Sequence, residues 1–443
     1  MSAQSVRIGC GAGFATDRID AAVEVVEQGN VDWLVLECLA ERTIAFGHRR
    51  ERAAPGTGYE PTIERRMRAL LGPLVATGTR LISNFGAANP MAAGELVRSI
   101  ANEMGIKIKV AVVTGDDVMA ALDMGSIVWE TGRPLGEHES LISANAYLGI
   151  DALLPAIATG ADVIISGRVA DPSLFLAPAV AELGWSVEDY QLLAAGTVAG
   201  HLLECGGQVT GGYFADPPYK VVPDIARVGF PIAEITADGA VVVTKVPGTG
   251  GVVNFETVCE QLTYEVIDPT GYLTPDVILD LTEVRLTEVG RDRVEVHSAT
   301  GRPRPNQLKV SVGQAIGYLA EGEMSYAGPG CVTRAEISAD ILRKRLSPDL
   351  RNVRIDIVGV NSLNESRFGD SYHEPAECRI RMAAIAENYH AAELANEEVI
   401  TLYTNGPAGG GGCRTHIYDQ IGILSVLMDR DIISTDVHIL ETA

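Results

Sequence analysis

The sequence predicts an α/β fold: a mostly parallel sheet with flanking helices, followed by a C-terminal part of α+β type. Three observations lead to this prediction. Glycine supplies 47 of the 443 residues, whereas Phe, Trp and Tyr together make only 5%, a balance that favours α/β layers joined by tight turns. Apolar runs alternate with helical patterns in the first half. After residue 220, this pattern gives way to segments in which apolar and polar residues alternate, as in β-hairpins.

Five apolar runs of the first half are predicted strands, at residues 6–9, 32–37, 80–84, 109–114 and 162–166. Amphipathic helices such as 19–28 and 91–104 separate them. The runs are apolar throughout (VDWLVLE, ADVIIS), as expected when helices cover both faces of a parallel sheet. A doubly wound sheet is therefore predicted, with a closed eight-stranded barrel as the alternative.

The second half has a different pattern. Alternating runs at 225–246 and 277–296, with turns at 238–239 and 290–291, predict antiparallel hairpins. Further strands are expected at 353–360, 378–386 and 399–404, with a helix at 391–398. We therefore predict two domains: 1–220 with the active-site loops, and 221–443 with a glycine-rich loop.

The charge and the cysteines narrow the class of protein. A formal net charge of −23 at pH 7 argues against nucleic acids and anionic membrane surfaces as partners. The seven cysteines are scattered without a C-x-x-C pair, a usage typical of reduced thiols in the cytosol. Neither a signal peptide nor a run of about 18 apolar residues is visible. We expect a cytoplasmic homo-oligomer that binds a small organic acid.

Polar or glycine-rich residues directly follow each of the five predicted strands. Because the carboxyl ends of parallel strands meet at one edge of a sheet, ligands bind there. The sequence therefore predicts one active site at this edge. Its candidate residues are Cys10 and Gly11, Glu37, Asn84, Asp116 and Asp117, and Arg168 with Asp171.

The first of these loops does not fit a dinucleotide. A G-x-G-x-x-G motif would require glycine where Phe14 or Thr16 stands. We therefore predict no nicotinamide or flavin cofactor.

Two of the candidates form the expected acid/base pair. Glu37 and Asp116 on neighbouring strand ends, partly removed from water, would push each other's pKa values apart, as proton transfer requires. The alternative is that either carboxylate caps a helix or pairs with Arg42 or Arg168. Arg168 would clamp a substrate carboxylate or form an internal salt bridge with Asp171.

A second cluster contains His201, Glu204, Cys205, Gln208 and Thr210. His201 and Cys205 are four residues apart and share one face of a helix, so a thiolate nucleophile at Cys205 is one hypothesis. A buried thiol beside a helix-end histidine is the other.

The third feature is the segment 404–412 (TNGPAGGGG), which is predicted to follow a strand and to precede a helix at 417–428. Exposed N–H groups at a helix start bind anions, so this loop is expected to hold the substrate. A flexible surface loop or an interface turn is the alternative. Its candidate residues are Asn405, Gly409, Gly410 and Gly411.

Metal sites have little support in the sequence. There is no H-x-H or H-E-x-x-H motif, and the segment 370–374 (DSYHE) is weak by itself. No metal ligands are predicted, although a carboxylate-held Mg²⁺ would leave little spacing signature.

Ten ordered segments make the sequence similar to the acyclic terpene utilisation (AtuA) family over nearly the whole chain. They include IGCGAGFATDR at 8–18, ECLAERT at 37–43, NFGAANP at 84–90, ISANAYLG at 142–149, SGRVADPS at 166–173 and TNGPAGGGG at 404–412. The resemblance implies catabolism of branched acyclic terpenoids through acyl-CoA intermediates, and a small ferredoxin-like partner subunit. It brings no catalytic assignment; Asn145, in one of these segments, is a further candidate for substrate binding.

Together these features lead us to expect a lyase, a hydratase or retro-aldol enzyme, that acts on a branched unsaturated or hydroxylated acid or its thioester. Glu37 and Asp116 would move protons, while Asn84, Arg168 and the 404–412 loop would hold the carboxylate, thioester oxygen or enolate. The alternatives are a hydrolase that uses Cys205 or a bound water, and a non-catalytic subunit of an acyl-CoA-processing complex.

Overall fold

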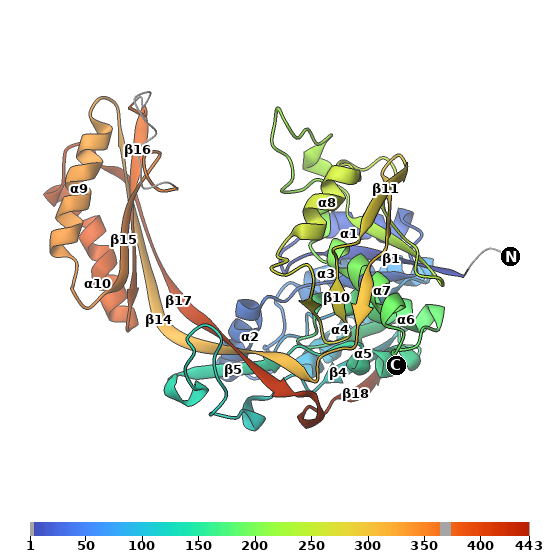
Figure 1. Cartoon of the computed structure of the whole chain (residues 1–443). Coiled ribbons are helices and arrows are strands. Elements are labelled where there is room, and N and C mark those ends of the chain that lie inside the picture. Colours follow the sequence, from blue (N-terminus) through green and yellow to red (C-terminus); the bar gives the residue numbers. More distant parts are fainter. Residues whose placement is uncertain (1–3, 364–373, 443) are drawn as a thin grey trace. The chain divides into compact units, whose positions relative to one another are not determined.

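The computed structural model describes residues 4–363 and 374–442 (Figure 1). The chain divides into two compact units: unit 1 comprises Met1–Gly313 and Ile423–Ala443, and unit 2 comprises Gln314–Gly422. The chain passes between them within two long strands, β14 (Gln307–Ala327) and β17 (Gly411–Asp429). The boundary expected at residue 220 does not coincide with this division.

Unit 1 is built on a mixed sheet whose centre is parallel. The five strands predicted in the first half form this centre, and each bound agrees with the prediction to within a few residues. They lie in the order β1 (Ser5–Ala12), β2 (Trp33–Leu36), β3 (Arg80–Ser83), β6 (Val163–Ile165) and β4 (Lys109–Thr114).

Antiparallel strands extend this centre at both edges, so the prediction of a mostly parallel sheet is not confirmed. β18 pairs with β4, and four strands continue the sheet beyond β1. The sheet runs from β11 to β18 and is therefore open, not a closed barrel. The added strands are β7 (Pro231–Thr236), β8 (Val241–Lys245), β12 (Arg293–His297), β11 (Arg285–Gly290) and β18 (Asp436–Glu441).

Residues beyond 220 continue the first sheet through these added strands. The hairpin expected at 225–246 is present as β7 and β8, and β7 pairs directly with β1. Ser5 lies opposite Thr236 and Gly9 opposite Ile232. Backbone hydrogen bonds thus join the hairpin to the first sheet, although its alternating pattern differs from that of the central strands.

Helices cover both faces of the parallel centre, as predicted. Along β2, Leu34 and Leu36 belong to one hydrophobic cluster while Trp33 and Val35 belong to another, because successive side chains point to opposite faces of a sheet. The first cluster is completed by α1 (Ile19–Gln28), α3 (Ile63–Thr77) and α4 (Pro90–Glu103). The second is completed by α5 (Ile150–Ala158), α6 (Asp171–Leu183) and α7 (Tyr190–Leu203).

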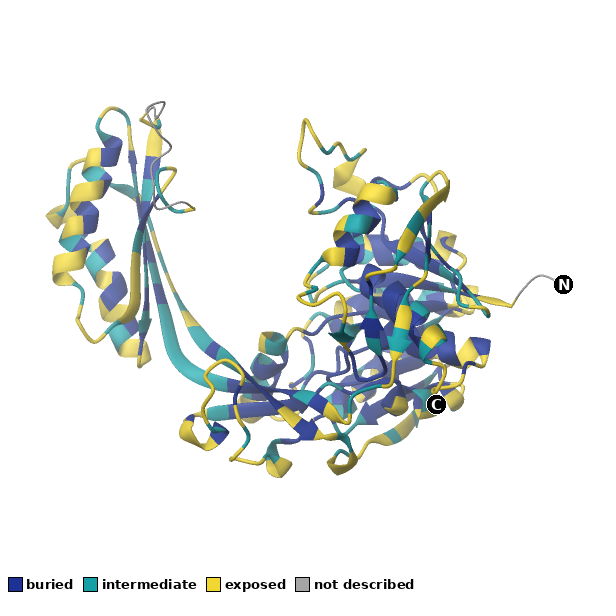
Figure 2. Cartoon of the chain, viewed as in Figure 1, coloured by how far each residue is buried: buried dark blue, intermediate teal, exposed yellow. Residues whose placement is uncertain are grey.

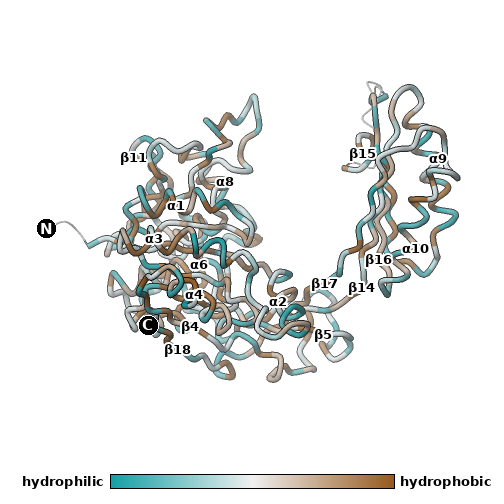
Figure 3. The backbone as a smooth tube through the Cα atoms, turned by 180° about the vertical axis from the view of Figure 1, so that it is seen from behind, coloured by the Kyte–Doolittle hydropathy of each residue, from teal (hydrophilic) through white to brown (hydrophobic). Residues whose placement is uncertain are grey.

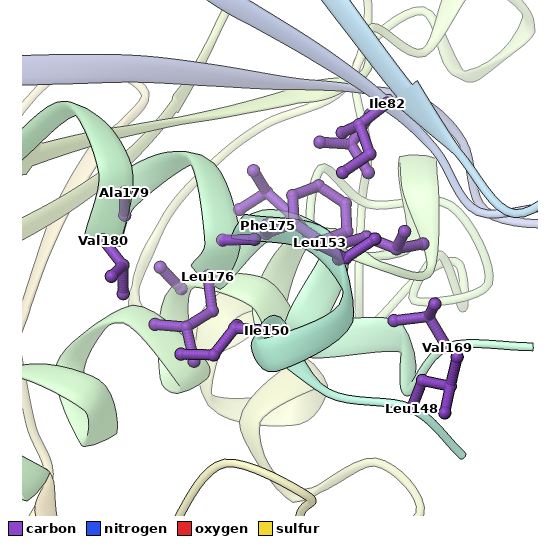
Figure 4. Close-up of a cluster of buried hydrophobic side chains, with 14 of the residues drawn as sticks. Ile82, Leu148, Ile150, Leu153, Val169, Phe175, Leu176, Ala179 and Val180 are labelled. Carbon is purple, nitrogen blue, oxygen red and sulfur yellow. The ribbon is translucent and has the colours of Figure 1, made fainter. Parts of the chain in front are cut away.

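The second cluster is the larger one. Figure 4 shows Phe175 of α6 and Leu153 of α5 close to Ile82 of β3, and all three are fully buried. Buried residues of this kind are dark blue in Figure 2, where the sheet centre of unit 1 is almost uniformly buried. Close packing on both faces therefore holds the carboxyl ends of the strands in place.

Further elements of unit 1 surround the sheet. β5 pairs with β14, and a small sheet has the order β13–β10–β9. The turn expected at 290–291 joins β11 to β12, whereas the start of the run at 277–296 belongs to the small sheet. The bounds are α2 (Glu41–Ala53), β5 (Leu141–Ala146), α8 (Phe255–Thr263), β9 (Tyr272–Leu273), β10 (Ile278–Asp280) and β13 (Thr300–Arg302).

Unit 2 has the strand and helix order βαββαβ. Its sheet has the order β15–β16–β14–β17, the arrangement of a split βαβ motif. Helices α9 and α10 pack on β16, and Figure 3 shows that α9 carries both hydrophobic (brown) and hydrophilic (teal) positions. The bounds are α9 (Cys331–Arg345), β15 (Arg351–Val358), β16 (Glu377–Ala386), α10 (Tyr389–Ile400) and α11 (Leu402–Asn405).

Two predicted elements of this unit are wrong. Residues 399–404 contain the end of α10 and most of α11, not a strand, and residues 417–428 lie within strand β17, not in a helix. In β17 the exposed and partly buried residues alternate along 411–418, which is the period of a strand. A short apolar run fits either period, so tertiary packing decides between them.

Candidate active site

A cavity of about 1380 Å³ opens at the carboxyl ends of the central strands. Its described lining residues all belong to unit 1. They include the segment 13–18 after β1, Glu37 and Glu41 after β2, and Arg168 and Asp171 after β6. The edge of the sheet predicted to hold the site therefore borders the cavity.

Glu37 occupies a buried position in this lining. Its Oε1 accepts hydrogen bonds from the backbone N–H of Leu39, at 2.7 Å, and from Nδ2 of Asn84, at 3.0 Å. Asn84 is itself fixed, because its Oδ1 accepts from the N–H of Cys38. Both bonds end on Oε1, and the residue lines the cavity. Burial raises the pKa of Glu37 to about 7, although Arg168 and the hydrogen bonds lower it in part.

Arg168 lies beside Glu37 and is almost completely buried. Its guanidinium donates to the carbonyl of Leu39 and, at 2.6 Å, to Oδ1 of Asp171. The internal salt bridge considered for Arg168 is therefore present. Its guanidinium also stacks on the ring of Tyr147 at 4.1 Å. The side chain lines the cavity, but its role as a clamp for a substrate carboxylate stays a prediction.

Tyr147, Glu41 and Lys309 form a polar group next to this arginine. The hydroxyl of Tyr147 donates to Glu41, whose Oε1 lies 3.2 Å from Nζ of Lys309. The ammonium of Lys309 also lies 4.8 Å from the Tyr147 ring. Burial alone would raise the pKa of Glu41, but Arg168, Tyr147 and Lys309 outweigh it and hold that pKa at about 2. Glu41 is therefore ionised at neutral pH.

Asp116 serves another network and does not line the cavity. Its Oδ2 accepts from the N–H of Arg168, at 2.8 Å, and from Nδ2 of Asn145, at 2.9 Å. The Oδ1 of Asn145 in turn lies 3.0 Å from Nε2 of His48. Burial raises the pKa of Asp116 to about 6. The structure does not bring Glu37 and Asp116 together as a pair at the cavity. Instead, the Asp116 carboxylate binds the backbone N–H of Arg168 and holds that loop in place.

Other strand-end candidates also lie away from the cavity lining. Cys10 is fully buried within β1, and a Cβ on Gly11 would lie 2.4 Å from Cδ2 of Leu36. Asp117 is exposed, and its Oδ1 accepts from the N–H of Met119. These residues shape the strand ends without bordering the space that a ligand would occupy.

The loop after β1 touches the segment that follows α7. A Cβ on Gly13 would lie 2.4 Å from the carbonyl carbon of Cys205 and 2.6 Å from the nitrogen of Gly206. Only glycine allows this approach of two backbones. Asp17 strengthens the loop, since its Oδ2 accepts from the N–H of Gly13.

Cys205 lines the cavity but is not activated as a nucleophile. Burial raises its pKa to about 12, so the thiol stays protonated at neutral pH. His201 does not assist it: Nδ1 lies 3.2 Å from Oε1 of Glu204, and Nε2 lies 3.2 Å from the carbonyl of Leu262. The histidine therefore pairs with Glu204, which also lines the cavity.

The glycine-rich loop at 404–412 belongs to unit 2 and is not part of the cavity lining. It joins α11 to β17, so no helix begins after it and the predicted anion site at a helix start is wrong. Asn405 donates to the carbonyl of Thr401, and Arg334 donates to that of Ala408. The glycines allow the loop to lie close to other residues of unit 2. Gly409 has φ +76, a Cβ on Gly410 would lie 3.2 Å from Sδ of Met324, and Gly411 has open space around it.

Within residues 4–363 and 374–442, no group of three or more His, Cys, Asp or Glu side chains could hold a metal ion. Of the weak motif at 370–374, residues 370–373 lie outside the described residues. None of the described helices is both long enough and apolar enough to cross a membrane.

Apolar side chains also line the cavity. These side chains come from six different segments of unit 1, so no single sequence motif marks them. They are Phe14, Leu39, Val228, Phe230, Leu273, Leu308 and Leu427.

Several polar lining residues were missed from the sequence. Glu41 and Tyr147 stand within the segments ECLAERT and ISANAYLG, where they could have been found from the family resemblance. Lys309 and Glu265 have no local signal, because only the fold brings the start of β14 and the segment after α8 to the cavity.

Comparison with known proteins agrees with the resemblance seen in the sequence. The model of the acyclic terpene utilisation family protein AtuA matches residues 6–439. No curated protein and no solved structure matches the chain. Since the family model covers nearly the whole chain, the protein belongs to the AtuA family of acyclic terpene utilisation.

Proposed function

We propose that the protein is a lyase, a hydratase or retro-aldol enzyme, that acts on a branched unsaturated or hydroxylated acid or its thioester. Membership of the AtuA family supports a role in acyclic terpene breakdown. The observation that carries the proposal is Glu37: a buried carboxylate at the cavity whose pKa is raised to about 7.

A carboxylate of this kind is suited to proton transfer. Its pKa lies near neutral pH, so both of its protonation states are populated, and general acid–base catalysis is most efficient under that condition. Addition or removal of water next to a carbonyl, and retro-aldol cleavage, both depend on proton transfer. Neither reaction requires electrons from a redox cofactor, and we propose none.

The lining of the cavity suits an acyl chain with a polar end. The apolar lining residues, among them Phe14 and Leu427, would bury branched hydrocarbon, at about 25 cal/mol for each Å² removed from water. The polar end would lie near Arg168 and Lys309. The volume of 1380 Å³ exceeds the roughly 300–1,000 Å³ of a typical small-molecule site, which leaves room for the carrier of a thioester.

The test is turnover of a panel of branched unsaturated and hydroxylated acids and their coenzyme A thioesters by the full chain. Gain or loss of water, or cleavage into two carbonyl fragments, supports the proposal. Release of free thiol would identify a hydrolase instead. Absence of turnover unless a partner subunit is added would indicate the non-catalytic subunit.

Glu37→Gln gives the test its residue-level control. The amide oxygen can still accept from Leu39 and Asn84, so the fold should persist while kcat falls about 10²–10⁴-fold. Glu64→Gln makes the same charge change on the exposed surface of α3 and should leave kcat unchanged. Full activity of Glu37→Gln would remove Glu37 from the mechanism.

A further inference from the structure

Helix α7 ends in a buried pair of titratable groups. His201 lies in its last turn and Glu204 caps it. The side chain of His201 is 2% exposed and that of Glu204 is 11% exposed. Because the two residues are three apart, they lie on one face of the helix, and Glu204 faces the cavity.

The hydrogen-bond partners of His201 determine how many protons the pair holds. Nε2 lies 3.2 Å from the carbonyl oxygen of Leu262, which can only accept, so Nε2 carries a hydrogen. Nδ1 lies 3.2 Å from Oε1 of Glu204. Without a proton between them, two lone pairs would face each other in a buried place. The pair therefore shares one proton between Nδ1 and Oε1.

The second oxygen of Glu204 is without a partner among the described residues. Its Oε2 is buried and accepts no hydrogen bond, an arrangement that costs about 1–3 kcal/mol and calls for an explanation. The residue lines the cavity next to Cys205. A ligand that donates a proton or a hydrogen bond to Oε2 would satisfy this atom.

The groups around the pair act on it in opposite directions. Glu265, Glu37 and Asp171 come from three different segments and are acidic, and the Cys205 thiol is neutral. Arg168 is a cation whose charge lowers the pKa of Glu204. The ring of Tyr272 lies 5.5 Å from that of His201. Burial, followed by the influence of neighbouring carboxylates such as Glu265, raises the pKa of Glu204. The pKa of His201 is also raised, because Glu204 and the Leu262 carbonyl outweigh burial.

We propose that His201 and Glu204 form a proton-accepting dyad: Oε2 of Glu204 takes a proton from the substrate while the shared proton moves from Oε1 to Nδ1. This inference rests on the proposed lyase function. Glu204 is then a catalytic residue, and His201 is a positioning residue that stores the displaced proton. The geometry of the dyad does not depend on which branched substrate is used.

In the dehydration direction the step balances as follows. The C–H bond next to the carbonyl breaks, its proton goes to Oε2, and its electron pair forms the carbon–carbon double bond. The C–O bond breaks, and the hydroxyl group leaves as water with a proton from Glu37. The imidazolium–carboxylic acid pair that results then returns one proton through solvent to the Glu37 carboxylate.

Protonation of His201 can be measured without turnover. In the full chain labelled with ¹³C at histidine Cε1, eight histidines give eight signals, and His201→Gln identifies the one from His201. We expect this signal to titrate at higher pH than an ordinary histidine, and Glu204→Gln to lower its pKa. A His201 signal that Glu204→Gln leaves unchanged would overturn the dyad, whether or not a substrate is known.

Turnover gives the second readout, on any substrate that the wild type converts. Glu204→Gln should lower kcat about 10²–10⁴-fold, and His201→Gln should lower kcat and change its pH profile while KM stays nearly constant. The exposed pair His390–Glu393 has the same i,i+3 spacing on α10, so His390→Gln and Glu393→Gln are matched controls that should leave kcat unchanged. If the wild type turns over substrate and the kcat of Glu204→Gln stays within about threefold of it, the dyad is refuted but the lyase proposal is not. If the wild type shows no turnover, the lyase proposal is refuted.

Discussion

Asp116 should make the stability of unit 1 depend on pH in a defined direction. Burial raises its pKa from the ordinary 3.8 to about 6, so between these values the folded chain binds more protons than the unfolded chain. The free energy of unfolding therefore falls as pH rises from about 4 to about 6. A tenfold change in acid dissociation corresponds to about 1.4 kcal/mol, so this carboxylate costs about 3 kcal/mol at pH 8.

Asp116→Asn removes that cost and keeps the hydrogen bonds. Both donors, the N–H of Arg168 and Nδ2 of Asn145, end on Oδ2, and an amide oxygen in the same place can accept both. Relative to the wild type, the variant should gain up to about 3 kcal/mol between pH 4 and pH 8. Most of the gain should be present by pH 6.

The assay is urea denaturation at several pH values, followed by tryptophan fluorescence. All three tryptophans, Trp33, Trp129 and Trp185, lie in unit 1, so the signal reports on the unit that contains Asp116. Asp123→Asn is the control, because that exposed carboxylate also accepts a backbone N–H. Parallel curves for Asp116→Asn and wild type across the pH range would refute the reasoning.

Two further substitutions test the geometry of the cavity. Gly13→Ala would place a Cβ 2.4 Å from the backbone of Cys205; we expect at least a tenfold loss of kcat/KM and a lower melting temperature, and unchanged values would show that the two backbones can separate freely. Tyr147→Phe keeps the ring on Arg168 but removes the hydroxyl that donates to Glu41. The pKa of Glu41, held at about 2, should rise, which ¹³C carboxyl NMR can follow; a constant value would assign that effect to Arg168 and Lys309 alone.

The central strands and the edge that carries the site could be predicted because their signals are local. A strand buried on both faces is apolar along its whole length, and loops at its carboxyl end must provide polar groups to a ligand. Glu37, Arg168 and Asp171 were found in this way, and all three line the cavity. Asp116 also follows a central strand, yet its side chain binds the backbone N–H of Arg168 and does not line the cavity. This contact joins residues 52 positions apart, so no local signal predicts it.

By itself, the sequence determined the family, the five central strands and part of the cavity lining. Tertiary structure alone decided that 231–245 joins the first sheet, that 417–428 is a strand, and that Glu204 lines the same cavity as Glu37. The physical reason is the range of the interactions. Periodicity and turn residues act over a few positions, whereas strand pairing, burial and the pKa values of Glu37 and Glu204 depend on segments far apart in the chain, which only packing brings together.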